Sequence, residues 1–262
     1  MKTIQWFHSY HMVDKSPWPF IFSINMSNLL LSFIIYYMNN SLYMKMSMSM
    51  VIMIILFWTR DIFRESTFQG HHTKNVSLLM KTSMLVFISS ELMFFFSFFW
   101  AYFYNSLNPS YEIGNMWPSI NITMFNPFNL PLLNTLILLS SGMTITWSHF
   151  SLLNNKLYMT MKTLILTLIL GLLFSYIQLF EYKNSLFSLN DSIFGSIFYM
   201  LTGFHGSHVI FGSMFIFYNF ILLILGQINS KHHFSFEASI WYWHFVDIIW
   251  LFLYIFLYWF YY

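Results

Sequence analysis

Long apolar segments recur along this chain, and each is about as long as a lipid bilayer is thick. Hydrophobic residues make up 58% of its 262 residues and charged residues only 8%, whereas soluble domains have about 25% charged residues. About 20 apolar residues span a bilayer as a helix. These runs are too long and too uniformly apolar for barrel strands. We therefore predict an all-α, polytopic membrane protein with seven helices, at residues 17–38, 42–59, 78–105, 129–150, 160–180, 192–225 and 234–260.

The basic residues fall unevenly on the two sides of this predicted bundle. Of the eleven Lys and Arg residues, only Lys45 and Lys183 lie on the side opposite the N-terminus. Basic loops stay on the cytoplasm-like side of a membrane. We therefore expect the N-terminus on that side, which is the matrix in a mitochondrion, and the C-terminus on the other side.

Composition also excludes some functions. The chain has no cysteine, so it forms no disulfide, thiolate metal site or cysteine nucleophile. Its net charge of +2 is too small to indicate binding to nucleic acid.

A charged segment, RDIFRESTFQGHHT at residues 60–73, follows the second predicted helix. One interpretation is a solvated helix end. The other is a site for a lipid head group, because arginine binds phosphate through two parallel hydrogen bonds. Arg64 would supply the charge, His71 lies nearby, and Trp58 would anchor the segment at the interface. If the segment is helical or tightly turned, two ion pairs can form: Arg60 with Glu65, and Asp61 with Arg64.

The third predicted helix carries one ionisable residue, Glu91, within SSELMFFFSFFWAYF. A carboxylate in hydrocarbon costs about 3 kcal/mol on insertion scales. Three interpretations stay open: Glu91 is protonated and hydrogen-bonded at a helix contact, it relays protons, or it faces a lipid or another subunit. Ser83, Ser90 and Ser97 recur on one face, where small polar side chains allow a neighbouring helix to approach.

The sixth and seventh predicted helices carry the other intramembrane polar residues. His205 and His208 are three residues apart in GFHGSHVIFG, and Asp247 follows His244 by three, so those two can hydrogen-bond. Glu237 shares a helical face with His244. The three histidines could bind one metal, but nothing in their spacing demands it, and we favour structural roles. Three glycines would allow another helix to approach closely: Gly203, Gly206 and Gly212.

Taken together and in order, several segments resemble the cytochrome c oxidase subunit III family of the mitochondrial type. The matching segments are HMVDKSPWPF, RDIFRESTFQGHHT, SSELMFFFSFFWAYF, PLLNTLILLSSGMTITWSH, FEY, GFHGSHVIFGS and HHFSFEASIWYWHFVDIIWLFLYIFLYW. The resemblance covers essentially the whole chain. It implies a single membrane domain, residues 1–262, in which helices 1–2 (about 17–59) are separated from helices 3–7 (about 78–260) by a cleft that holds phospholipid.

The resemblance also implies a function and partners. Members of this family are core subunits of the oxidase that reduces dioxygen to water with electrons from cytochrome c and pumps protons across the mitochondrial inner membrane. Haem and copper belong to partner subunits, so this chain is expected to bind no metal or redox cofactor and to have no catalytic residue. Its expected partners are the catalytic subunit I, subunit II, accessory subunits and structural phospholipids.

The resemblance assigns roles to four residues of this chain. Glu91 matches the family's buried glutamate, Arg64 and His71 match positions near bound lipid, and Trp58 is their companion. Two other functions stay open: a metal-binding membrane enzyme, and a transporter or proton channel. The channel would use Glu91, Glu237 and Asp247, although the chain lacks the paired, interrupted helices of many transporters.

Overall fold

A computed structural model describes residues 10–11, 15–38, 41–111, 114–119 and 122–260, and no strand occurs among them. Each of its seven α-helices is long and apolar enough to cross a membrane, which confirms the all-α prediction. The helices are α1 (Trp18–Tyr37), α2 (Ser41–Thr67), α3 (Lys74–Leu107), α4 (Leu130–Leu153), α5 (Leu157–Asn184), α6 (Ile193–Ile224) and α7 (Phe234–Leu253), and a π-helical segment, η2 (Tyr254–Trp259), continues α7.

With η2 counted as part of the seventh helix, the predicted helix ends agree with the structure to within four residues except at the end of α2. That helix continues eight residues beyond its predicted end at 59 and stops at Thr67. Hydropathy marks where the chain leaves the apolar layer, whereas the helix itself ends only where the backbone leaves the helical conformation. Gly70, with a φ of 68°, is the first glycine after that point, and glycine adopts this left-handed conformation easily.

The described chain forms two compact units, residues 1–80 and 81–262. In the first, α1 packs along α2. The hydroxyls of Ser32 and Ser47 lie 2.8 Å apart across this contact, and the rings of Phe22 and Trp58 meet edge to face at 6.0 Å. The prediction of a single membrane domain remains a prediction.

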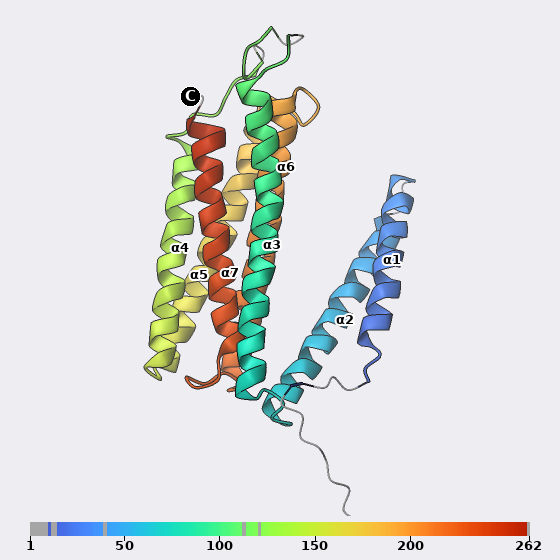
Figure 1. The fold of residues 1–262 in the computed structure, drawn as a ribbon, viewed down its shortest axis with the longest axis vertical. Coiled ribbons are helices and arrows are strands. Elements are labelled where there is room, and N and C mark those ends of the chain that lie inside the picture. The colour runs from blue at the N-terminus through green and yellow to red at the C-terminus, as the bar shows by residue number, and fades with distance from the viewer. Residues whose placement is uncertain (1–9, 12–14, 39–40, 112–113, 120–121, 261–262) are drawn as a thin grey trace, which may run out of the picture. The chain divides into compact units, whose positions relative to one another are not determined.

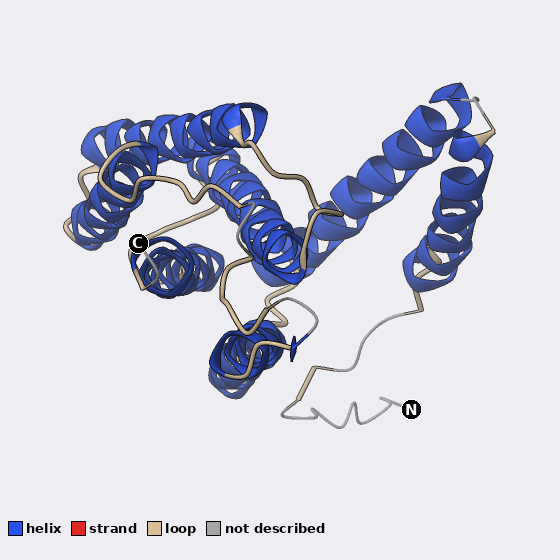
Figure 2. Cartoon of the chain, turned by 90° about the horizontal axis from the view of Figure 1, so that it is seen from above, coloured by secondary structure: helices blue, strands red, loops and turns tan. Residues whose placement is uncertain are grey.

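In the second unit, α3 to α7 run alongside one another (Figure 1). Figure 2 looks along these helices and shows the loops that connect them. The most extensive helix contact is between α4 and α5, and small polar side chains take part in it. Ser151 of α4 shares a hydrogen bond of 2.8 Å with Thr160 of α5. Small residues let helix backbones approach in a membrane, where lipid provides no hydrophobic force between helices.

Trp243 of α7 lies at the centre of this unit, with its side chain fully buried. Its indole nitrogen donates a 2.9 Å hydrogen bond to Ser141 of α4. Glycines make room for the ring on two other helices: a Cβ at Gly171 of α5 would lie 2.8 Å from it, and one at Gly212 of α6 would lie 3.0 Å away. One large side chain therefore joins four helices.

Helix α3 meets the rest of the second unit through large side chains. Phe94 packs edge to face on Phe204 of α6, with ring centroids 5.0 Å apart. Tyr102 donates a 2.8 Å hydrogen bond to the carbonyl of Phe256 in η2. These aromatic spacers hold α3 in place while leaving space between its backbone and α6.

Candidate functional site

An apolar groove with a volume of 690 Å³ opens between α3 and α6. Its polar wall contains Glu91 of α3 and His208 of α6, and Tyr242 of α7 lies beneath them. Phenylalanines supply most of the remaining surface. The lining residues are Met84, Phe87, Ser90, Glu91, Phe94, Phe204, Ser207, His208, Phe211, Phe215 and Tyr242. A groove of this composition is suited to an apolar chain.

Glu91 and His208 are hydrogen-bonded across the groove. Glu91 Oε2 lies 3.0 Å from His208 Nε2, and His208 Nδ1 lies 2.7 Å from the carbonyl oxygen of Phe204. A carbonyl only accepts, so Nδ1 carries a hydrogen. The Nε2 contact then holds one further proton, either on the carboxyl group or on the imidazole. In both arrangements the pair has no net charge, which explains how a carboxyl group is accommodated in an apolar wall.

The other intramembrane histidines have separate surroundings. His205 is buried, and its Nε2 donates to the carbonyl of Val246 at 3.2 Å. His244 Nδ1 lies 3.6 Å from Asp247 Oδ2, which is longer than an ordinary hydrogen bond. Within the described ranges, His205, His208 and His244 do not form one cluster of ligand atoms.

Glu237 faces a different set of residues at the beginning of α7. Its Oε2 lies 2.6 Å from Lys81 Nζ of α3, and its Oε1 lies 3.3 Å from His233 Nε2. Glu237 is therefore not part of the groove lining, and it contacts Lys81 in α3 and His233 immediately before α7.

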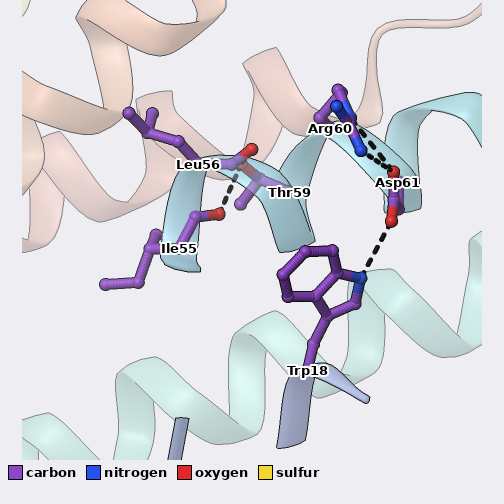
Figure 3. A network of polar contacts seen from close by, with 6 residues as sticks. All are labelled: Trp18, Ile55, Leu56, Thr59, Arg60 and Asp61. Atoms are coloured by element: carbon purple, nitrogen blue, oxygen red, sulfur yellow. Dashed lines mark hydrogen bonds and ion pairs between the residues drawn. The ribbon is translucent and has the colours of Figure 1, made fainter. Parts of the chain in front are cut away.

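In the first unit, the charged end of α2 pairs differently from either predicted arrangement. Figure 3 shows the Asp61 carboxylate between Trp18 and Arg60. The Trp18 indole donates to Oδ2 at 2.8 Å, and Arg60 donates twice to Oδ1, at 3.1 and 3.0 Å. Glu65 lies 3.3 Å from His11. The predicted Arg60–Glu65 and Asp61–Arg64 pairs were wrong. Asp61 is bound by Trp18 of α1 and by its sequence neighbour Arg60, and Glu65 contacts His11, which lies outside α2.

This rearrangement leaves the Arg64 guanidinium exposed, with no hydrogen bond or ion pair in the described chain. His71 is near the same end of α2: its ring lies 5.4 Å from that of His11, and its backbone N–H donates to the carbonyl of Glu65. Trp58 is six residues before Arg64, so at 3.6 residues per turn the two side chains leave different faces of α2. Glu91 belongs to the second unit.

Only some of the small residues predicted to allow close helix contacts lie at such contacts. Gly212 is in close contact with the Trp243 ring, whereas a Cβ at Gly203 or Gly206 would meet nothing within 4 Å. The hydroxyls of Ser90 and Ser97 donate to carbonyls of their own helix, at 2.6 and 2.7 Å, and not to a neighbouring helix.

Sequence reasoning missed a buried polar cluster between α4, α5 and η2. Glu181 is fully buried, and its Oε1 accepts a 2.6 Å hydrogen bond from Tyr258. One turn away, Asn134 donates to Gln178 at 3.3 Å. Glu181 and Gln178 are three residues apart near the end of α5, and this spacing was the available signal.

Comparisons with known proteins agree with this architecture. The family model for cytochrome c oxidase subunit III matches residues 8–262. The chain is 49% identical to cytochrome c oxidase subunit 3 of Rhipicephalus sanguineus over 97% of its length and 99% of the relative's length. It is 45% identical to the Chondrus crispus protein of the same name, over 96% and 94% of the two chains. The corresponding Struthio camelus protein is 48% identical, over 96% and 97%.

Proposed function

Because this chain belongs to the cytochrome c oxidase subunit III family, we propose that it is a non-redox core subunit of cytochrome c oxidase. This complex reduces dioxygen to water with electrons from cytochrome c and pumps protons. The observation that carries the proposal is the family match over residues 8–262, together with seven helices able to cross a membrane. The chain would support the catalytic subunit and its proton uptake in the mitochondrial inner membrane, with its N-terminus in the matrix and its C-terminus in the intermembrane space.

The environments of the histidines support a non-redox role. Haem and copper would be bound by subunits I and II. His208 uses both ring nitrogens for hydrogen bonds within the chain, and His205 uses its Nε2. A ring nitrogen that donates to a carbonyl is protonated and is not a metal ligand.

Purification of the assembly under mild conditions tests this function. The chain is expected to copurify with a haem-bearing catalytic subunit, with subunit II and with accessory subunits. A redox metal ligated by this chain's own side chains, or an assembly without haem, would contradict the proposal. Proton flux through the reconstituted chain alone that depends on Glu91 would favour the channel alternative.

The proposal includes two regions for phospholipid. The exposed Arg64 guanidinium, with His71 nearby, would hold an anionic head group in the first unit, and Trp58 would anchor α2 at the interface. In the second unit, the groove beside Glu91 would hold an acyl chain, since its wall is largely phenylalanine.

Replacing Arg64 with alanine is expected to lower the phospholipid retained by the purified complex. A charge-assisted, two-point contact contributes about 1.5–3 kcal/mol, so the lipid at this position should bind at least about tenfold more weakly. Lipid mass spectrometry, normalised to haem, measures the loss. Lys45→Ala removes an exposed cation at the other end of α2 and serves as the control. Equal lipid content in the Arg64→Ala and Lys45→Ala complexes would reject the head-group site.

The Glu91–His208 pair gives a separate spectroscopic prediction. In an apolar wall, a neutral acid and a neutral imidazole avoid the cost of burying two charges. Infrared spectra at neutral pH should therefore contain a protonated carboxyl band that disappears in Glu91→Gln. The band should persist in Glu65→Gln, which changes the carboxylate beside His11. Carboxylate bands in its place would show that the proton resides on His208.

A further inference from the structure

A second cluster of ligand-type side chains lies away from the groove, where the end of α4 meets the beginning of α7. It consists of His149 of α4, His233 immediately before α7, and Glu237 in the first turn of α7. One nitrogen or oxygen atom from each lies within 4.8 Å of the other two. All three side chains are partly buried.

The surrounding residues orient two of these groups toward a common point. His233 Nδ1 lies 3.2 Å from the carbonyl oxygen of Asn229, so Nδ1 carries the hydrogen and Nε2 faces Glu237 Oε1 at 3.3 Å. Lys81 Nζ holds the other carboxylate oxygen, Oε2, at 2.6 Å. Backbone and side-chain partners of this kind fix the tautomer of a histidine ligand and the orientation of a carboxylate ligand.

His149 supplies an independent observation. Its Nε2 is buried and has no hydrogen-bond partner in the described chain, although its ring lies only 5.5 Å from that of His233. A buried polar atom without a partner costs about 1–3 kcal/mol. The Lys81–Glu237 ion pair explains the position of Glu237, but it leaves His149 Nε2 without a partner.

We propose that His149 Nε2, His233 Nε2 and Glu237 Oε1 form a binding site for a divalent transition-metal cation, with Zn²⁺ as the favoured ion. Two imidazole nitrogens and one carboxylate oxygen form a borderline donor set that suits zinc. Tetrahedral zinc keeps its ligands about 3.4 Å apart, given bonds of about 2.1 Å, so side-chain adjustments of about an ångström close the cluster. A water molecule would take the fourth position.

A cation at this point would join α4 to α7. The ion would satisfy the buried nitrogen of His149 and draw Glu237 toward both imidazoles. Lys81 would remain on the outer carboxylate oxygen as a positioning residue and not as a ligand. The site would be structural or regulatory, since it requires no change of oxidation state.

The test uses the intact assembly that contains the full chain, treated with a chelator and then equilibrated with Zn²⁺ alone. Anomalous diffraction at the zinc absorption edge should give a peak between the His149 and His233 imidazoles. His149→Gln and Glu237→Gln should each weaken zinc binding at this position by at least about tenfold, because even loss of a supporting contact costs 10- to 100-fold. His244→Gln, which changes another histidine of α7, should leave the peak unchanged.

Two results would overturn the site: no peak at this position in the unaltered chain at saturating zinc, or a peak of equal occupancy in His149→Gln and Glu237→Gln. If both variants fail to assemble, His149→Asn in an assembled complex provides the same comparison, because a shorter amide cannot reach the cluster. The inference rests only on contacts within the second unit, so its failure would leave the oxidase assignment intact.

Discussion

Replacing Trp243 with alanine is expected to lower the free energy of unfolding by about 3–5 kcal/mol, the usual cost of removing a buried tryptophan side chain. The ring is completely buried and lies against Gly171 and Gly212, with its N–H donating to Ser141. The temperature at which this chain dissociates from its purified assembly measures the effect.

Two further variants separate packing from hydrogen bonding. Trp243→Phe keeps an aromatic ring but loses the hydrogen bond to Ser141, which contributes about 1 kcal/mol. Its dissociation temperature should therefore fall between those of the unaltered chain and Trp243→Ala. Trp100→Ala removes a tryptophan that is 67% exposed and should change the stability of the bundle little. Equal losses for Trp243→Ala and Trp100→Ala would show that Trp243 does not hold the four helices together.

The fold was predictable because the apolar layer imposes its thickness on every crossing segment. Each segment must satisfy its backbone hydrogen bonds internally, so hydropathy alone identified all seven helices. It could not locate the end of α2, since Arg60, Asp61 and Arg64 leave the apolar layer without leaving the helix. Hydropathy describes the solvent around a residue, while the helix end depends on backbone conformation.

The candidate site was predictable only in part, for a different reason. Helical spacing identified Glu91 and His208 as polar residues within apolar segments, but they are 117 residues apart in sequence, and nothing local indicates that they meet. Within α2 the spacing led to the wrong ion pairs, because it contains no information about Trp18 or His11. The partners of a charged group are set by tertiary contacts, which a single sequence does not reveal.

The second large effect on stability is expected from substitution of a glycine in α6. At Gly195, an added Cβ would lie 2.5 Å from the backbone carbonyl oxygen of Ser188, and a backbone atom cannot rotate aside as a side chain can. The same segment begins α6, where Ser192 accepts a 3.0 Å hydrogen bond from the Gly195 N–H. Gly195→Ala is therefore expected to destabilise the chain by about 1–3 kcal/mol and to shift the loop between α5 and α6.

Gly203 is the matched control, since it lies eight residues further along the same helix and a Cβ there would meet nothing within 4 Å. Alanine is a better helix former than glycine by up to about 1 kcal/mol, so Gly203→Ala should be neutral or stabilising. The two identical substitutions should thus have opposite effects on the dissociation temperature of the chain. If Gly203→Ala proves as damaging as Gly195→Ala, the face of α6 at Gly203 is occupied in the assembly by a closely packed neighbour, and the prediction from this chain alone is wrong.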